Sequence, residues 1–234
     1  MDSLSLQDRA TLNSLSLYLA TRQTALRCAL SLRTPLTTAQ TSDLRVNYSN
    51  YFSSLISAVE LLRESASLSI GFSALLESRF VFAENPSGKV NYSYVRELRN
   101  AIVHRGLDIS AAAHIKSGIP FFIAPHAISN QSGAKSYPRL SFYVLGIVAK
   151  CESVIPCAIE QHLANIGVLE RSPDPEQWVA ETLSLIEQSE VIPEWVRGMT
   201  SGAVKMVKPR DVHRASLERL RSGMQPYLAL PRCD

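Results

Sequence analysis

The sequence predicts an all-α fold, and three observations support this prediction. Apolar residues make up 46% of the 234 residues and charged residues 19%, so the chain can bury a full core. Apolar positions recur at intervals of three and four residues, which is the spacing of one helix face. The alternating apolar and polar pattern that is typical of strands does not appear outside one loop, at 107–139.

The first two helices follow directly from this spacing. Leucines predict a helix over residues 6–32, and they lie at Leu12, Leu15, Leu19, Leu26 and Leu30. The sequence TPLTT (34–38) breaks the pattern, and Ser42 can cap the helix predicted over 43–68. The apolar positions of that second helix are Leu44, Tyr48, Tyr51, Leu55, Val59 and Leu62.

Three more helices are predicted in the middle of the chain. A short helix runs through FSALLESRF (72–80), and ENPSGK (84–89) is a turn by composition. The next helix covers about 91–105. Helical pattern returns at 140–166, interrupted or kinked at Pro156.

The loop at 107–139 mixes Gly, Pro and Ser with one short apolar run, IPFFIA. It is long for a connection within a compact domain, and it has room for a short hairpin. Loops of this length often carry function. Gating of a site or selection of a substrate is therefore the hypothesis for this loop.

The C-terminal segment differs in charge from the rest of the chain. Residues 174–194 hold six acidic side chains and no Lys or Arg, whereas residues 197–221 hold seven basic and two acidic ones. We therefore predict two parts, a helical bundle over 1–169 and a helical C-terminal extension over 170–234. The basic side chains either bind phosphates or pair with the acidic segment. Among them are Lys205, Lys208, Arg210, Arg214, Arg219 and Arg221.

Overall composition narrows the class of protein. The formal net charge of +3 allows a polyanionic partner without requiring one. The four cysteines, Cys28, Cys151, Cys157 and Cys233, form no CxxC pair, so neither a zinc site nor a disulfide framework is expected. The N-terminus lacks the pattern of a signal peptide, and no apolar run reaches the roughly 20 residues of a membrane span. We expect a soluble cytoplasmic protein with no membrane partner.

Motifs for cofactors and metals are absent from the sequence. It contains no GxGxxG, GxxxxGK[ST], HExxH or GxSxG. His114 and His126 lack acidic or cysteine partners at metal-ligand spacing, and His162 and His213 fall on polar helix faces that predict surface residues. Glu60 is interpreted as part of a solvated helix face. We expect no cofactor and no metal.

One polar cluster remains, in the sequence YVRELRNAIVHRGLD (94–108). Its members are Arg96, Arg99, Asn100, His104 and Arg105. Gly106 stands where a helix is expected to end, which puts the histidine in the last turn, where the helix dipole favours an imidazolium. Two interpretations are open: the cluster is a site, or it is a basic helix end that complements the dipole.

Helical geometry separates two members of this cluster. Arg96, Asn100 and His104 recur every four residues and share one face. At ~100° per residue, Arg99 and His104 lie about 140° apart around the helix. We expect them to meet only if the arginine side chain reaches back, the helix unwinds near Gly106, or a second copy of the helix faces the first.

The sequence LRNAIVHRG resembles the signature of the HEPN superfamily, in which an arginine is followed after four to six residues by a histidine and commonly has a polar residue directly after it. The matching residues here are Arg99, Asn100 and His104. The resemblance covers roughly 6–166 as a helical bundle, with 107–139 as an insertion. It implies a HEPN-like fold and metal-independent endoribonuclease activity, of the kind found in toxin–antitoxin and anti-phage defence systems.

The resemblance also implies roles for these residues. His104 would act as a general acid or base, Arg99 would hold the phosphate through two hydrogen bonds, and Asn100 would orient the pair or bond the ribose. Arg96 and Arg105 are the RNA-binding residues expected beside them. The implied partners are RNA, a second copy paired through the motif helix, and a cognate antitoxin or defence protein.

The sequence departs from one subgroup of the family at Gly106. Toxins paired with a nucleotidyltransferase antitoxin often carry a tyrosine there, so regulation through modification of that tyrosine is not expected. Some superfamily members keep the fold and have no known cleavage activity. A non-catalytic dimerising adaptor or RNA-binding scaffold is therefore the alternative function, and a purely structural helix end is the third.

Overall fold

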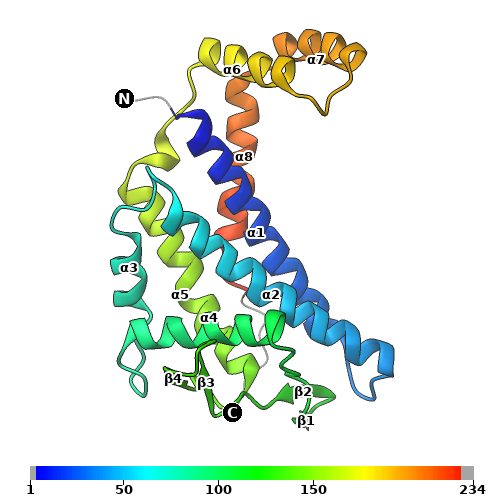
Figure 1. The fold of residues 1–234 in the computed structure, drawn as a ribbon, viewed down its shortest axis with the longest axis vertical. Coiled ribbons are helices and arrows are strands. Elements are labelled where there is room, and N and C mark those ends of the chain that lie inside the picture. Colours follow the sequence, from blue (N-terminus) through cyan, green and yellow to red (C-terminus); the bar gives the residue numbers. More distant parts are fainter. Residues whose placement is uncertain (1–3, 228–234) are drawn as a thin grey trace.

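The computed structural model describes residues 4–227 and is mostly α-helical (Figure 1). Its helices are α1 (Leu6–Ser31), α2 (Thr38–Glu64), α3 (Phe72–Arg79), α4 (Gly88–His104), α5 (Val144–Asn165), the 3-10 helix η1 (Val168–Glu170), α6 (Pro175–Gln188), α7 (Glu194–Met206) and α8 (Pro209–Met224). The strands are β1 (Ala113–Lys116), β2 (Ile119–Phe122), β3 (Ala127–Ser129) and β4 (Ser136–Pro138). None of the helices in this described part combines the length and the apolar character that crossing a membrane requires.

Two long helices, α1 and α2, pack against each other along most of their length (Figure 1). The leucines predicted to face the core from α1 are buried, except Leu30, which is half-buried, and all six apolar positions predicted for α2 are buried. α2 begins earlier than predicted. Thr37 and Gln40 form a capping box, in which each side chain accepts the backbone amide of the other residue. The predicted cap at Ser42 is therefore wrong, and Ser42 lies inside the helix.

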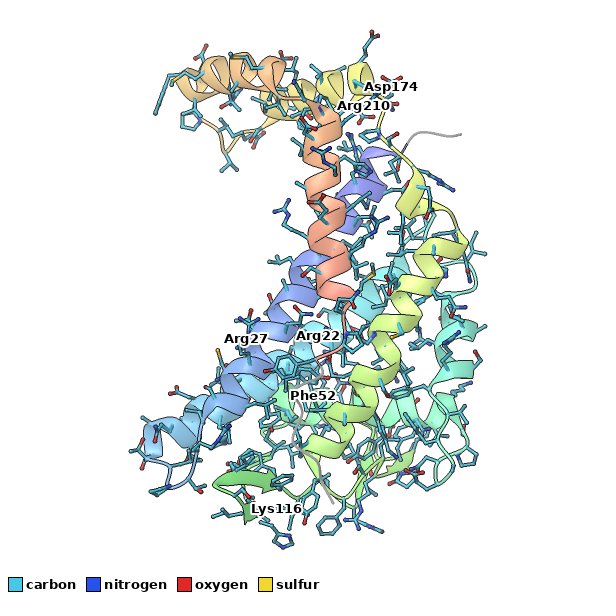
Figure 2. The ribbon with its side chains drawn as sticks, turned by 180° about the vertical axis from the view of Figure 1, so that it is seen from behind. Arg22, Arg27, Phe52, Lys116, Asp174 and Arg210 are labelled. Carbon is cyan, nitrogen blue, oxygen red and sulfur yellow. The ribbon has the colours of Figure 1, made fainter. Side chains whose placement is uncertain are left out.

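The helices α3, α4 and α5 complete the bundle around this pair. α4 contacts α2, and α3 contacts both α4 and α5 (Figure 1). Buried aromatic side chains fill the space between them, including Tyr51, Tyr94 and Phe52, the last of which Figure 2 labels inside the bundle. α5 runs to its end without the predicted interruption at Pro156. The proline removes one helical hydrogen bond, but it is buried, so core packing keeps the helix continuous there.

The loop predicted at 107–139 holds two antiparallel hairpins, β1–β2 and β3–β4. The fold is thus mostly α rather than all-α. In the first hairpin Ala113 pairs with Phe122. Phe121 and Phe122 from the IPFFIA run are buried, and Phe122 packs edge-on against Tyr48 of α2 with 5.7 Å between ring centroids. This run forms a strand because it extends over the bundle and buries its aromatic rings there.

The C-terminal segment is helical, and its last helix returns to the bundle. α6 and α7 form a hairpin in which α6 contacts the start of α8, and α8 runs back along α1 (Figure 1). Gly223 of α8 allows close packing, because a Cβ there would lie 3.0 Å from the Cβ of Leu19. The buried Arg22 of α1 donates to the carbonyls of Gly223 and Gln225 at this junction (Figure 2).

The cysteines of the described part are free thiols. Cys28 is exposed, Cys151 is buried and Cys157 is half-buried. Cys233 lies outside the described residues, as does the side chain of Lys205, so the predictions made for these two are not addressed by the structure.

Candidate functional site

The motif helix α4 is fixed at its start by α3. The Ser87 hydroxyl accepts the amide of Val90 and caps the helix. Gly88 passes so close to α3 that a Cβ there would lie 1.8 Å from the carbonyl oxygen of Glu77. Only glycine fits this contact, so the sequence at the start of α4 sets its position on the bundle.

The end of α4 lies where the sequence predicts it. Gly106 has a φ of 69°, in the left-handed region that favours glycine. The amides of Arg105 and Leu107 both donate to the carbonyl of Ala101, which closes the last turn. His104 is the last residue of the helix, and its side chain is exposed. The histidine therefore stands at the negative end of the helix dipole.

A pocket of about 620 Å³ opens between the second half of α4 and the β3–β4 hairpin. α4 contributes Arg96, Glu97, Asn100, His104 and Arg105 to its lining, and the hairpin contributes Asn130, Gln131, Ser132, Lys135 and Tyr137. Four of the five predicted site residues therefore share one pocket. The fifth, Arg99, is not among the lining residues.

The pocket is positively charged around one buried carboxylate. Glu97 is 5% exposed, and its carboxylate lies 3.6 Å from the guanidinium of Arg96 and 3.5 Å from that of Arg105. Asn100 donates to the same carboxylate at 3.4 Å. With Lys135 on the hairpin side, cations outnumber the carboxylate. Sequence reasoning missed Glu97, and the available signal was a glutamate placed among the apolar positions of α4.

Arg105 lines the pocket and also holds one of its walls in place. Its guanidinium donates to the carbonyl of Ser129 at 2.6 Å and to the carbonyl of Glu97 at 3.0 Å. These bonds tie β3 to α4 and fix one wall of the pocket. The side chain of Arg96 is 40% exposed, so Arg96 can turn toward an anionic ligand with less rearrangement than Arg105.

Arg99 points toward α2 and away from the pocket. It forms an ion pair with Glu60 at 2.6 Å, and the two side chains are 16% and 34% exposed. The interpretation of Glu60 as a solvated side chain is therefore wrong, because it lies partly buried against α4. The arginine does not reach back to His104, and α4 stays helical to its last residue. Within one chain the two motif residues remain apart, as helical geometry predicts.

The turn that follows α4 is anchored by Asp108. Its carboxylate accepts the Ser110 hydroxyl at 2.6 Å and the Ser110 amide at 2.9 Å, and it lies 3.2 Å from the guanidinium of Arg45 on α2. These contacts, the hydroxyl first, lower the pKa of Asp108 below its ordinary value. A charged carboxylate thus fixes the path of the chain from the motif to the hairpins.

Arginines of the C-terminal part surround a second pocket, of about 360 Å³, between η1 and α8. They are Arg171, Arg210, Arg214 and Arg221. No ion pair joins 174–194 to 197–221 among the described side chains, so the predicted pairing of these two segments is not seen there. Glu181 of the acidic segment instead pairs with Arg9 of α1.

Two histidines outside α4, His162 and His213, have structural contacts. His162 is 3% exposed and its Nε2 lies 2.6 Å from the carbonyl of Leu68, so its prediction as a surface residue is wrong. His213 is half-buried, with Nε2 2.8 Å from the carbonyl of Arg171. Between residues 4 and 227, no three His, Cys, Asp or Glu side chains gather as a metal-binding group would require.

Fold and site together define a mostly α-helical protein with a positively charged pocket at the end of its motif helix. Comparisons with protein-family models, with curated proteins and with solved structures found no match to this chain. The case for a function therefore depends on the residues of the pocket.

Proposed function

We propose that this protein binds RNA in the pocket at the end of α4 and cleaves it as a metal-independent endoribonuclease of the HEPN type. The observation that carries the proposal is the convergence of Arg96, Asn100, His104, Arg105 and Lys135 around one open space of about 620 Å³. A HEPN-like bundle belongs to the proposal, supported by the long pair α1 and α2 before α4 and by α5 after it. A toxin or anti-phage defence effector is the role proposed for this activity.

RNA suits such a pocket because it carries its own nucleophile. A base removes the proton of the 2′-hydroxyl, the 2′-oxygen bonds to the adjacent phosphorus, and the bond from phosphorus to the 5′-oxygen breaks. The leaving 5′-oxygen takes up a proton, so the products are a 2′,3′-cyclic phosphate and a 5′-hydroxyl. The enzyme has to move two protons and stabilise the extra negative charge on the phosphate.

The proposal gives each α4 residue a part in this reaction. His104 moves a proton, because an imidazole ring can both donate and accept one and this side chain is exposed beside the pocket. Arg96 neutralises the phosphate, and Arg105 does so from the wall that it holds in place. Asn100 makes only a long contact with Glu97, at 3.4 Å, which a ribose hydroxyl can replace.

Arg99 takes part through a second copy of the chain. Within one chain it is paired with Glu60 on the α2 side, whereas His104 lines the pocket. Two α4 helices facing each other would bring the arginine of one copy toward the phosphate held by the other. They would also supply two histidines, one for each proton transfer. RNA and this homodimer are the proposed partners, together with a cognate antitoxin or defence protein.

The test compares RNA cleavage by the wild type and by His104→Ala in the presence of EDTA. We expect the variant to lose about 10²–10⁴-fold in rate, the range of a general acid or base. Wild-type products should end in 2′,3′-cyclic phosphate, and the unfolding midpoint should not change. His126→Ala is the matched control, because His126 is an exposed histidine that does not line the pocket. Equal cleavage by wild type and His104→Ala overturns the assignment.

A non-catalytic RNA-binding adaptor is the second candidate function. The ion pair between Arg99 and Glu60 favours it, because that pair keeps Arg99 out of the pocket. RNA would then bind in the same pocket without being cleaved. Arg96→Gln should weaken binding by the equivalent of one phosphate contact and reduce the slope of affinity against salt by about 1. Salt-dependent binding with no cyclic-phosphate product selects the adaptor.

A further inference from the structure

The helix α7 carries apolar side chains that the described part of the chain leaves uncovered. Trp195, Met199 and Met206 are 72%, 71% and 86% exposed, and Val191, just before the helix, is 91% exposed. They are four of the five most exposed large apolar side chains between residues 4 and 227. Exposed apolar surface that gathers in one place marks an interaction site.

Three of these side chains form a stripe, which we call the α7 stripe. At ~100° per residue, Trp195, Met199 and Met206 lie within about 40° of one another around the helix. On the opposite side of α7, Val204 is 8% exposed, and the helix contacts α6. α7 therefore has two apolar faces, of which α6 covers one.

Two glycines one turn apart, Gly202 and Gly198, lie beside the α7 stripe, about 20° and about 60° from Trp195 around the helix. Glycine is the least favourable residue in a helix interior after proline, so its presence there needs a reason. A Cβ at either position would meet no described atom within 4 Å, which means that no described neighbour requires the missing side chain. Glycine at these positions leaves room for the close approach of another helix.

The two ends of the α7 stripe carry opposite charges. Glu190 and Glu194 are exposed at the N-terminal end, and Lys208 and Arg210 are exposed just past the C-terminal end (Figure 2 labels Arg210). None of the four forms an ion pair with another described side chain. An antiparallel pair of α7 helices brings the acidic end of each copy to the basic end of the other, whereas a parallel pair brings like charges together.

We propose that α7 binds α7 of a second copy of this chain, antiparallel and about a two-fold axis. An axis through the middle of the helix sets Trp195 opposite Met206 of the other copy and Met199 opposite Gly202. The methionine fills the space that the glycine leaves, and the same register joins the oppositely charged ends. This interface is separate from the proposed RNA site, because α7 and α4 lie at opposite ends of the molecule (Figure 1).

A second copy fits this surface better than an anionic lipid surface does. The segment 174–194 has six acidic residues and no basic one, so anionic headgroups would repel the chain beside the stripe. Glycines favour contact between helices and add no apolar surface for insertion. A single helix face buries less than a standard interface, so we expect association to be weak and dependent on concentration.

Sedimentation velocity of the full chain over a range of concentrations tests the proposal. The mass of the wild type should rise with concentration and exceed that of Met199→Asp, because the variant puts two carboxylates at the apolar centre of the α7 contact and keeps only the pairing through α4 that the proposed function requires. Ile70→Asp is the matched control, since Ile70 is 77% exposed but lies before α3. A wild type that stays monomeric, or Met199→Asp that associates like the wild type, overturns the proposal.

Charge reversal tests the antiparallel arrangement. Glu194→Lys alone or Lys208→Glu alone sets like charges together at both ends of the pair, so each variant should associate roughly ten-fold more weakly. An equal mixture of the two variants restores pairs of opposite charges, and its association should return toward the wild-type level. A mixture that associates no better than either variant overturns the arrangement.

Two further variants test the helix contact itself and its independence from the RNA site. Gly202→Ala should strengthen the isolated helix yet weaken the association, since the added methyl group keeps the helices apart. His104→Ala should not change the association, so a failure of the ribonuclease proposal is distinguishable from a failure of this one. Binding of the wild type, but not of Met199→Asp, to vesicles of anionic phospholipid without self-association would identify lipid as the occupant and overturn the proposal.

Discussion

Two clusters show how differently this protein uses arginine and glutamate. In the core, Arg22 lies 3.4 Å from Glu152, and the two side chains are 0% and 2% exposed. Arg22 also donates to the carbonyls of Gly223 and Gln225, and Glu152 accepts the amide of Tyr227. This closed cluster joins α1 and α5 to the chain around the end of α8.

The cluster on α4 also pairs a buried glutamate with arginines, but one side of it faces the pocket. Glu97 is buried, whereas the side chains of Arg96 and Arg105 are 40% and 31% exposed and line the pocket. In the closed cluster Nη2 of Arg22 donates to backbone carbonyls, and its Nε and Nη1 are buried with no hydrogen-bond partner among the described residues. On α4 the exposed arginine side chains can reach a ligand. An arginine–glutamate pair therefore indicates a binding site where the arginine side chains are exposed to an open space, as those of Arg96 and Arg105 are.

Breaking the closed cluster should have the largest effect on stability. Glu152→Leu leaves the charge of Arg22 buried without its carboxylate, and we expect the free energy of unfolding to fall by about 3–5 kcal/mol. Urea denaturation followed by circular dichroism measures this. A loss of no more than about 1 kcal/mol, typical of an exposed ion pair, would contradict the closed character of the cluster.

A double variant provides the control for that measurement. Arg22→Met combined with Glu152→Leu removes both charges, and replacing a buried ion pair by apolar residues is often close to neutral. Here the carbonyls of Gly223 and Gln225 also lose their donor. We therefore expect the double variant to lie between Glu152→Leu and the wild type in stability. A double variant less stable than Glu152→Leu would show that hydrogen bonds to the backbone outweigh the ion pair.

A substitution in the cluster on α4 should have a smaller effect on the free energy of unfolding and a larger effect on RNA binding. Glu97→Gln removes the charge and keeps the shape, and we expect a loss of about 1.5 kcal/mol in the free energy of unfolding. RNA affinity at low salt should rise, because Glu97 is the one carboxylate among the lining residues. Fluorescence anisotropy with labelled single-stranded RNA measures this. If Glu97→Gln has the RNA affinity of the wild type, RNA does not bind in this pocket.

The spacing of residues along one helix predicted those features of the protein that involve only that helix. The core faces of α1, α2 and α4, the helix end at Gly106 and the shared pocket of Arg96, Asn100 and His104 follow from positions along one helix. Pairs between helices do not follow from spacing. The partner of Arg99 lies 39 residues away in the sequence, and any exposed glutamate of the same face would have been an equal candidate.

Other parts were decided by tertiary packing. A short apolar run such as IPFFIA predicts a buried strand and a buried helical turn equally well. Only the burial of Phe121 and Phe122 over the bundle selects the strand. His162 lies among polar residues of α5, yet a carbonyl of the turn after α2, that of Leu68, gives its ring nitrogen a buried partner.

The ion pair between Arg99 and Glu60 differs from both clusters, because its arginine is less exposed than Arg96 and Arg105 and its glutamate is more exposed than Glu97. Its side chains are 16% and 34% exposed, so Glu60→Gln should lower the free energy of unfolding by only about 0.5–1 kcal/mol. The ribonuclease proposal predicts that this variant keeps its RNA cleavage, because it frees Arg99, whereas Arg99→Gln loses cleavage. Rates measured with one RNA substrate decide this. Equal cleavage by both variants would restrict Arg99 to a structural role.

The smallest expected effect concerns Cys151, which adjoins the closed cluster. Burial first, and then the charge of Glu152, raise the pKa of the Cys151 thiol well above its ordinary value of 9.0. The unfolded thiol ionises near that value and the folded one does not. Cys151 therefore contributes stability that is complete at neutral pH and is lost as pH rises above about 9. Cys151→Ala should reduce this alkaline loss in urea denaturation, measured relative to the variant's own stability at pH 7.

Thiol labelling gives an independent measure of how closed the core cluster is. At pH 8 an alkylating reagent should modify the exposed Cys28 in the native protein and leave Cys151 unmodified until urea unfolds the chain. Mass spectrometry of the peptides separates the two sites. In Glu152→Leu, Cys151 should label faster, since the weakened junction opens more often. Native Cys151 that labels as fast as Cys28 would mean that the cluster of Arg22 and Glu152 is open, like the one on α4.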